Sequence, residues 1–215
     1  VINIPDIQRK QITADKNIYN ITFLDNEAYL SCGFGIVVIN LERNEIKDTY
    51  FIGEEGSPLR VFDTEFFGSY IYAATERGIL RAEKDNPNLL DCRNWQKTDN
   101  IPHENGKFNH LAIHAGYLLV NYTPDEYDQD EIYRLNGEEW QPFLHEINFV
   151  HDIQVKGEYL IVTGRSEIFL VDDNNIVTEK INKYRFGDRE VFPVNPRSAL
   201  LSSGGSLFLA DYEYG

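Results

Sequence analysis

Residues 63–79 read Asp63-Thr-Glu-Phe-Phe-Gly-Ser-Tyr-Ile-Tyr-Ala-Ala-Thr-Glu-Arg-Gly-Ile79. An apolar and aromatic run ends at Gly68-Ser69, a second run ends in the small residues Ala73-Ala-Thr75, and a glycine followed by isoleucine begins a third. Short runs of β-branched, aromatic and apolar residues bounded by Gly, Asn or Asp are typical of antiparallel strands. This stretch therefore predicts two complete strands and the start of another.

Four other segments of the chain repeat the same pattern. They are residues 18–36, 110–120, 152–164 and 198–210. The turn glycines of the last four copies are 48, 41 and 48 residues apart, at Gly68, Gly116, Gly157 and Gly205. Repeats of roughly this length, each with three or four strands, are the signature of β-propeller blades. We therefore expect an all-β propeller, and an all-β sandwich with coincidental spacing is the alternative.

The repeat spacing also predicts how the chain is divided. We expect one propeller domain, residues 1–215, with four complete four-stranded blades and a partial fifth. The expected blades are residues 14–57, 58–103, 104–146, 147–194 and 195–215. The fifth stops at Tyr214-Gly215, where its third strand is expected to begin, whereas Val1-Ile-Asn-Ile4 resembles a closing strand.

Two interpretations of these ends remain open. The N-terminal strand completes the fifth blade of a small five-bladed ring, or the chain is a fragment of a larger propeller of about seven blades. We favour the fragment, because the fifth blade would be one strand short even after that exchange.

Charge and composition exclude several kinds of partner. The chain has 20 Lys and Arg against 35 Asp and Glu, a net charge of −15, which would repel the phosphate backbone of a nucleic acid. No apolar run approaches the roughly 20 residues that span a bilayer, so no transmembrane segment is expected. Two cysteines, Cys32 and Cys92, are too few for a disulfide scaffold, and whether they pair stays open.

The first strand of each blade supplies the first candidate site. In a propeller these innermost strands surround a central channel. The polar residues at or near their starts are Asn20, Asp63, His110, His151, Asp152 and Ser198. Two histidines and two carboxylates suit a metal or acid–base site. The alternative is that these side chains only hydrogen-bond to neighbouring blades and to water in the channel.

An acidic segment supplies the second candidate site. Residues 121–150 contain eight acidic residues and one basic residue. Asp125, Asp128 and Asp130 are suitable oxygen ligands for a hard cation such as calcium. However, residues 124–131 lack the glycine and the terminal glutamate spacing of an EF-hand. The alternative is an acidic insertion that is simply solvated.

No motif predicts catalysis. The nucleophile-elbow, zinc-protease and P-loop patterns are absent from the sequence. Cys32-Gly-Phe-Gly35 leads into a strand rather than a helix, so it is no dinucleotide fingerprint. We therefore expect no enzyme activity and no cofactor.

Several segments resemble known propeller families. Tyr72-Ala-Ala-Thr75 followed by Gly78-Ile79 resembles the two-component-regulator propeller repeat. A wider set of segments is similar to the first propeller of the PorZ family of the Bacteroidetes type IX secretion system. These segments are Asn3-Ile-Pro-Asp6, Ile12-Thr-Ala-Asp-Lys16, Ala28-Tyr-Leu-Ser31, Gly33-Phe-Gly-Ile-Val-Val-Ile39, Glu45-Ile-Lys-Asp-Thr-Tyr50, Asn88-Leu-Leu-Asp91 and Asn94-Trp95.

The resemblance implies a function. PorZ-like proteins have two propellers and a C-terminal sorting domain, and they lie on the cell surface in an attachment complex with outer-membrane partners. They are thought to deliver anionic lipopolysaccharide, and no catalytic residue is carried over from them. The expectation is a non-enzymatic surface scaffold, exported through the periplasm, that binds surface polysaccharide or protein partners of the secretion complex.

The alternative function is the periplasmic ligand-sensing propeller of a hybrid two-component sensor kinase. Such sensors usually carry tryptophan where this chain has Tyr29, Tyr72 and Tyr159.

Overall fold

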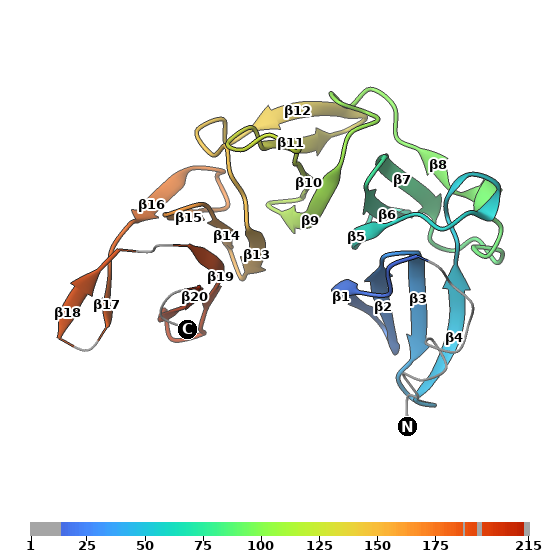
Figure 1. The fold of residues 1–215 in the computed structure, drawn as a ribbon, viewed down its shortest axis with the longest axis horizontal. Helices are drawn as coiled ribbons and strands as arrows, with labels where there is room; N and C mark the ends of the chain where they lie inside the picture. The colour runs from blue at the N-terminus through green and yellow to red at the C-terminus, as the bar shows by residue number, and fades with distance from the viewer. Residues whose placement is uncertain (1–13, 187, 193–194, 213–215) are drawn as a thin grey trace. The chain divides into compact units, whose positions relative to one another are not determined.

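Successive antiparallel strands form nearly all of the regular structure. The structure is a computed structural model that describes residues 14–186, 188–192 and 195–212. These residues form four four-stranded sheets and two two-stranded hairpins, and neighbouring strands in each sheet are consecutive in the chain (Figure 1). The predicted all-β propeller fold, with four complete blades and a smaller fifth, is confirmed. The strand expected at residues 1–4 and the chain end at residues 214–215 lie outside the described residues.

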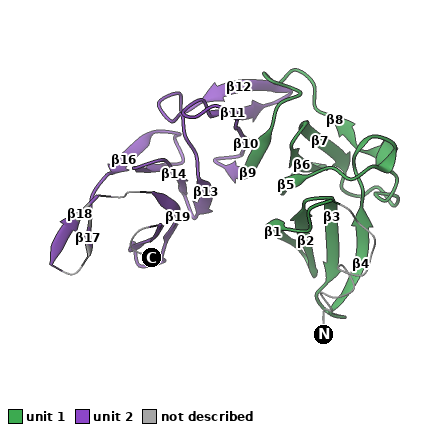
Figure 2. Cartoon of the chain, viewed as in Figure 1, with its two compact units in different colours: residues 1–111 green, residues 112–215 purple. Residues whose placement is uncertain are grey.

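The chain divides into two compact units, residues 1–111 and 112–215, which are coloured separately in Figure 2. The expected single domain and its blade bounds remain predictions.

Unit 1 contains the first two sheets. The first sheet consists of β1 (Ile18–Leu24), β2 (Glu27–Cys32), β3 (Gly35–Asn40) and β4 (Glu45–Tyr50). The second consists of β5 (Val61–Phe67), β6 (Tyr70–Thr75), β7 (Gly78–Glu83) and the two-residue β8 (Gln96–Lys97). Unit 1 also has two short 3₁₀ helices. The first, η1 (Glu54–Gly56), lies between β4 and β5, and the second, η2 (Cys92–Asn94), lies between β7 and β8. The first two strands of each sheet are joined by two-residue turns, which explains the turn residues that recur in the sequence.

The Thr-x-x-Gly repeat has a structural reason at the turn between β6 and β7. The Thr75 hydroxyl donates to the Gly78 carbonyl oxygen over 2.7 Å and accepts from the Arg77 N–H over 3.1 Å. Gly78 has a φ of +109°, and a Cβ built there would lie 2.2 Å from the Glu104 carbonyl oxygen. The threonine therefore closes the turn. The glycine leaves room for the backbone at Glu104, which a side chain at this position would displace.

The main core of unit 1 draws apolar side chains from both of its sheets. It consists of Tyr29, Ile36, Val38, Tyr50, Ile52, Leu59, Val61, Ile71, Ala73, Ala82 and Trp95. The middle strands carry the most deeply buried residues because they have a neighbouring strand on both edges and packing on their faces.

The third and fourth sheets supply most of unit 2. The third consists of β9 (Phe108–His114), β10 (Tyr117–Tyr122), β11 (Glu131–Asn136) and β12 (Glu139–Phe143), and β9 crosses the boundary between the units. The fourth consists of β13 (Asp152–Lys156), β14 (Tyr159–Thr163), β15 (Ile168–Val171) and β16 (Val177–Ile181). The hairpins are β17 (Tyr184–Phe186) with β18 (Arg189–Val191), and β19 (Pro196–Leu201) with β20 (Leu207–Asp211).

Unit 2 has its own core. One cluster consists of Ala112, Leu119, Ile132, Phe143, Leu144, Ile147, Val150, Ile153, Leu160, Val162, Phe169 and Val171. A second cluster joins Ile161 and Ile168 of the fourth sheet to Ala199 of β19. The last hairpin is thus held against the fourth sheet by apolar contacts.

The structure also bears on the two cysteines and on membrane-spanning helices. Cys32 and Cys92 are free thiols. No helix among the described residues is long and apolar enough to cross a membrane.

Candidate functional site

Asp63 connects the innermost strands of three sheets. Its Oδ1 accepts hydrogen bonds from the Asn20 side-chain amide on β1, over 2.5 Å, and from the Thr64 N–H, over 2.7 Å. Its Oδ2 accepts from the Leu111 N–H on β9, over 2.8 Å. Three donors therefore converge on one buried carboxylate, and two of them come from neighbouring sheets.

Burial changes the protonation of Asp63. Loss of solvation raises the pKa of its carboxyl to about 7, although the hydrogen bonds from Leu111, Asn20 and Thr64 favour the charged form. A raised carboxyl pKa is often found in catalytic acids. Here all three donors belong to the protein, so the carboxylate serves chiefly to join strands.

A second set of polar contacts reinforces the contact between the first two sheets. The Thr22 hydroxyl on β1 donates to the Thr64 carbonyl oxygen over 2.6 Å, and the Ser31 hydroxyl lies 3.4 Å from the Thr64 hydroxyl. Thr22, Ser31 and Thr64 were not among the site residues predicted from the sequence. Thr22 follows Asn20 by two positions and so lies on the same face of its strand, which is the signal that would have found it.

His151 and Asp152 make the corresponding contacts in unit 2. The Ser198 hydroxyl on β19 donates to Asp152 Oδ2, and the Gln154 side-chain amide lies 3.2 Å from both Asp152 oxygens. His151 Nδ1 lies 2.5 Å from the Pro196 carbonyl oxygen. Because a carbonyl oxygen only accepts, Nδ1 carries the proton. Asp152 therefore joins β13 to the last hairpin, and His151 makes a contact with that hairpin from the position just before β13.

The surroundings of His151 favour its neutral form. Its ring is half-buried and packs edge-on against Phe149, with 4.8 Å between the ring centres. Desolvation lowers the pKa of the His151 imidazole, against the opposing effect of the Pro196 hydrogen bond. A neutral imidazole bonded to a backbone carbonyl acts mainly as a structural contact.

His110 lies half-buried on β9 in unit 1, whereas His151 belongs to unit 2. A site that uses both histidines therefore remains a prediction. Within the described residues, no group of three or more His, Cys, Asp or Glu side chains is placed to hold a metal ion.

The three aspartates of the acidic segment have different surroundings. Asp130 is buried, and its Oδ2 accepts from the Val150 N–H over 2.8 Å and from the Asn121 side-chain amide over 3.3 Å. Asp128 forms an ion pair with Arg165 over 2.8 Å. Asp125 is exposed. Asp130 thus anchors the segment that leads into β13, and a cation site formed by all three remains a prediction.

Comparison with known proteins identifies relatives for part of the chain. Residues 1–96 match the family model described as the N-terminal β-propeller domain of PorZ of the type IX secretion system. Among curated proteins, none matches this sequence.

Solved structures resemble a larger share of the chain. PorZ from Porphyromonas gingivalis, described as an essential surface component of the type IX secretion system, is 19% identical over 84% of this chain and 23% of its own, with a TM-score of 0.64. The extracellular domain of the putative hybrid two-component system BT3049 from B. thetaiotaomicron is 13% identical over 95% of this chain and 34% of its own, with a TM-score of 0.59. Regucalcin from Agrobacterium tumefaciens, a calcium-binding protein, is 10% identical over 93% of this chain and 69% of its own, with a TM-score of 0.62.

At these identities the structural likeness establishes the fold alone. The chain spans about a quarter of the PorZ chain and about a third of the sensor chain. The expected resemblance to both groups of propellers is confirmed. The chain is a β-propeller segment that resembles PorZ, and its first 96 residues match the N-terminal propeller family of that secretion component.

Proposed function

We propose that the protein is a non-enzymatic binding propeller at the cell surface, associated with the outer membrane as part of a type IX secretion attachment complex. Its partners in this proposal are outer-membrane proteins of the complex and surface polysaccharide. The observation that carries the proposal is the match of residues 1–96 to the PorZ N-terminal propeller. The structural resemblance to PorZ over 84% of the chain supports it.

The hydrogen bonds of the candidate acid–base side chains support a binding role over a catalytic one. The carboxylates of Asp63 and Asp152 and the imidazole of His151 all hydrogen-bond to a neighbouring strand. A catalytic acid or base needs an atom that can reach a substrate.

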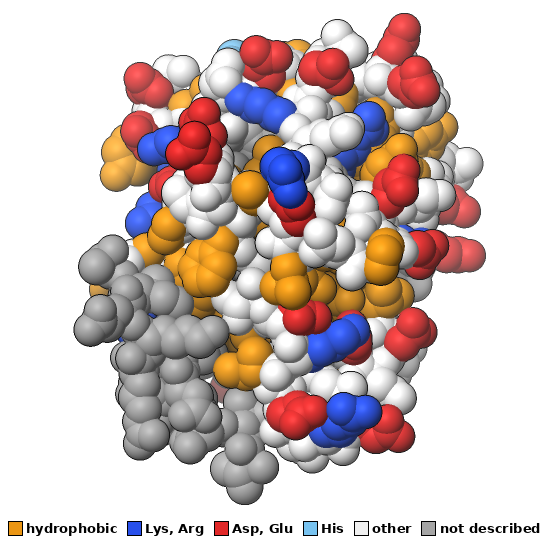
Figure 3. All heavy atoms as spheres, turned by 90° about the vertical axis from the view of Figure 1, so that its right-hand side faces the viewer, with side chains coloured by type: hydrophobic (Ala, Val, Ile, Leu, Met, Phe, Trp, Pro, Cys, Tyr) orange, Lys and Arg blue, Asp and Glu red, His pale blue; other side chains and the backbone are white. Residues whose placement is uncertain are grey.

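The charge of the chain bears on which partners are suitable. On the face drawn in Figure 3, acidic side chains are spread out and basic and apolar side chains lie between them. Together with a net charge of −15, this distribution opposes an approach by polyanions, anionic lipopolysaccharide and nucleic acid included. Within the proposal, protein partners and uncharged glycan are therefore favoured over anionic lipopolysaccharide.

The test is to locate and isolate the full-length protein in its own cells. An affinity-tagged copy is expected to be accessible to added protease on intact cells and to co-purify with outer-membrane proteins after mild crosslinking. Deletion of the gene is expected to leave secreted cargo in the periplasm. Normal cargo secretion in the deletion strain would reject the secretion role.

The alternative function, a periplasmic ligand-sensing propeller, is favoured by one observation. The hybrid two-component extracellular domain aligns with 95% of this chain, a larger share than PorZ does. The same tagged strain separates the two functions. A sensor would be protected from external protease, and its deletion would change transcription while leaving secretion intact.

A further inference from the structure

A cleft of about 490 Å³ opens in unit 1, and its lining includes none of the residues that join the inner strands. It is lined by the turn between β1 and β2, by parts of β3 and β4, and by the loop that follows β7. Its volume falls within the range of about 300–1,000 Å³ that small-ligand sites occupy. The first sheet and the loop between β7 and β8 both contribute to it, so a ligand would contact both at once.

The polar groups of the cleft include two amides with fixed orientation. Asn40 Oδ1 accepts from the Arg43 N–H over 2.8 Å, and Asn86 Oδ1 accepts from the Asn88 N–H over 2.9 Å. Each bond leaves the Nδ2 group of its amide as a donor, for which the described part of the chain offers no partner. The lining of the cleft therefore includes two amide donors whose Oδ1 atoms are already bonded.

The carboxylates of the cleft supply acceptors. The carboxylates of Asp25 and Asp48 form no hydrogen bond or ion pair with the described residues, whereas that of Glu27 is bound by Lys47 over 2.5 Å and by the Tyr29 hydroxyl over 2.9 Å. Lys84 is a further cation in the lining, so three carboxylates face two ammonium groups. This near balance disfavours a strongly charged ligand of either sign.

Apolar side chains lie beside these polar groups. Leu24, Pro87, Leu89 and Leu90 belong to the lining, and Leu90 is 58% exposed. Ligand sites typically combine such apolar contacts with a few placed donors and acceptors. A sugar ring has this same combination, since its hydroxyls both donate and accept while its C–H faces are apolar.

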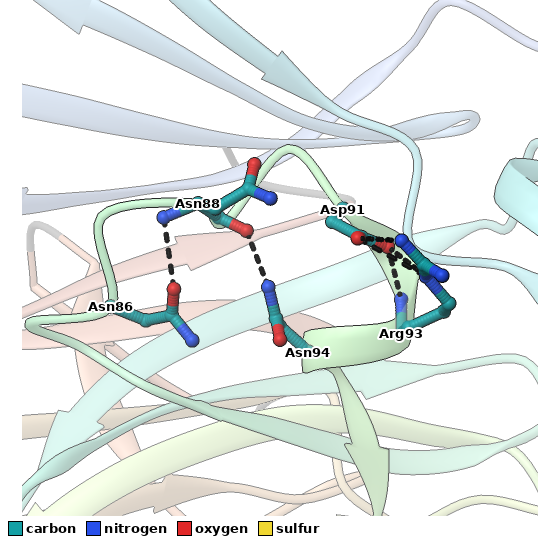
Figure 4. A network of polar contacts seen from close by, with 5 residues as sticks. All are labelled: Asn86, Asn88, Asp91, Arg93 and Asn94. Atoms are coloured by element: carbon teal, nitrogen blue, oxygen red, sulfur yellow. Dashed lines mark hydrogen bonds and ion pairs between the residues drawn. The ribbon is translucent and has the colours of Figure 1, made fainter.

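The loop that carries Leu90 is held in place before any ligand binds. The Asn94 side-chain amide donates to the Asn88 carbonyl oxygen over 2.7 Å, and the Arg93 guanidinium pairs with Asp91 over 2.6 Å (Figure 4). The Trp95 indole N–H donates to the Leu89 carbonyl oxygen over 3.0 Å. These hydrogen bonds hold the backbone on both sides of Leu90 in place. A rigid wall also lowers the entropy cost of binding.

We propose that this cleft binds an uncharged saccharide through the amides of Asn40 and Asn86, the carboxylates of Asp25 and Asp48, and the apolar side chain of Leu90. This inference deepens the proposed binding function and rests on it only in taking the propeller to be a binding module. It places the binding of surface polysaccharide in unit 1, and it specifies that the bound sugar is uncharged.

The first experiment compares neutral and anionic sugars as ligands of the purified full-length protein. The probes are an immobilised panel of neutral oligosaccharides, such as chitotetraose and dextran fragments, and of oligogalacturonates as the anionic set. Binding to at least one neutral member, and weaker binding to oligogalacturonates, is the expected result. Binding to no neutral member, or a preference for oligogalacturonates, overturns the proposal.

The second experiment measures the bound neutral sugar by titration calorimetry with variants of the cleft. Asp25→Asn with Asp48→Asn keeps the shape and removes both charges, and Leu90→Ala removes the apolar contact. Each is expected to weaken binding by about tenfold or more. Ile176→Ala is the matched control, since Ile176 is 59% exposed in a loop of unit 2. Full binding by both cleft variants overturns the assignment.

Failure of this inference is separable from failure of the proposed function. Co-purification with outer-membrane proteins and cargo secretion test the scaffold role without any sugar. A protein that supports secretion but binds no neutral sugar refutes the cleft alone. A protein that binds sugar through the cleft but leaves secretion unchanged when deleted refutes the scaffold alone.

Discussion

Asp63 in unit 1 and Asp152 in unit 2 lie near the starts of the first strands of their sheets but are held in different ways. Asp63 is buried and accepts from two backbone N–H groups and one side-chain amide. Asp152 is only partly buried, and its carboxylate bonds to the side chains of Ser198 and Gln154. A buried backbone donor has no water to replace a lost acceptor, whereas an accessible hydroxyl does. The contribution of each contact to the free energy of unfolding therefore depends on burial rather than on position in the repeat.

The largest expected effect is that of Asp63→Ala. The substitution leaves the Leu111 and Thr64 N–H groups and the Asn20 amide without their acceptor, at a cost of about 3 kcal/mol in the free energy of unfolding. Denaturant unfolding measures the loss, and hydrogen exchange at the Leu111 amide locates it in unit 1. The exposed Asp99, replaced by alanine, is the control. An equal effect of the two variants would contradict the role assigned to Asp63.

The pH dependence of stability follows from the same carboxyl. Its pKa of about 7 in the folded state exceeds the ordinary value of 3.8, so the folded protein holds the proton more tightly than the unfolded chain. The resulting stability is complete below about pH 4 and is lost as the pH rises through 7. Relative to Asp63→Asn, the wild type is expected to lose about 2 to 3 kcal/mol of unfolding free energy between pH 5 and pH 8. Parallel pH profiles for the two proteins would exclude this explanation.

Asp130→Ala tests whether burial matters equally in unit 2. Asp130 is buried and accepts from the Val150 N–H, as Asp63 does from the Leu111 N–H. With one backbone donor lost instead of two, the expected cost is about 1 to 2 kcal/mol. Hydrogen exchange at the Val150 amide is the measurement. Unchanged protection there would show that the comparison holds only for unit 1.

The smallest effect is expected for Asp152→Ala. Its partners Ser198 and Gln154 are themselves only partly buried, so water can replace the lost acceptor. The expected loss is below about 1 kcal/mol. A double-mutant cycle with Ser198→Ala measures the coupling between the two side chains. A loss comparable to that of Asp63→Ala would remove the distinction between the two positions.

Sequence reasoning was successful where a local pattern repeats. The alternating strands, the turn glycines and the Thr-x-x-Gly turn depend on contacts between residues close in sequence, as the hydrogen bond from Thr75 to Gly78 illustrates. The polar residues at the starts of the inner strands were recognised as a group. Their actual contacts, such as that between Asp63 and Leu111, join residues 48 positions apart.

Other features had no local signal. Asp130 has the same sequence surroundings as its acidic neighbours, yet it alone is buried against the Val150 N–H. The cleft of unit 1 combines Asp25, Asn40, Asp48, Asn86 and Leu90, which lie in separate segments of the chain. Asp, Asn and Leu are common throughout the sequence, so composition could not single these five out.

The all-β fold and its repeat follow from the amino-acid sequence, because strand alternation and turn chemistry act over a few residues. Which carboxylate is buried, which donors it meets and which turns enclose a cleft were decided by the packing of sheets against one another. Packing depends on distances between segments that the chain brings together only on folding. That is why Asp63 and Asp152 look alike in the sequence and differ in the folded protein.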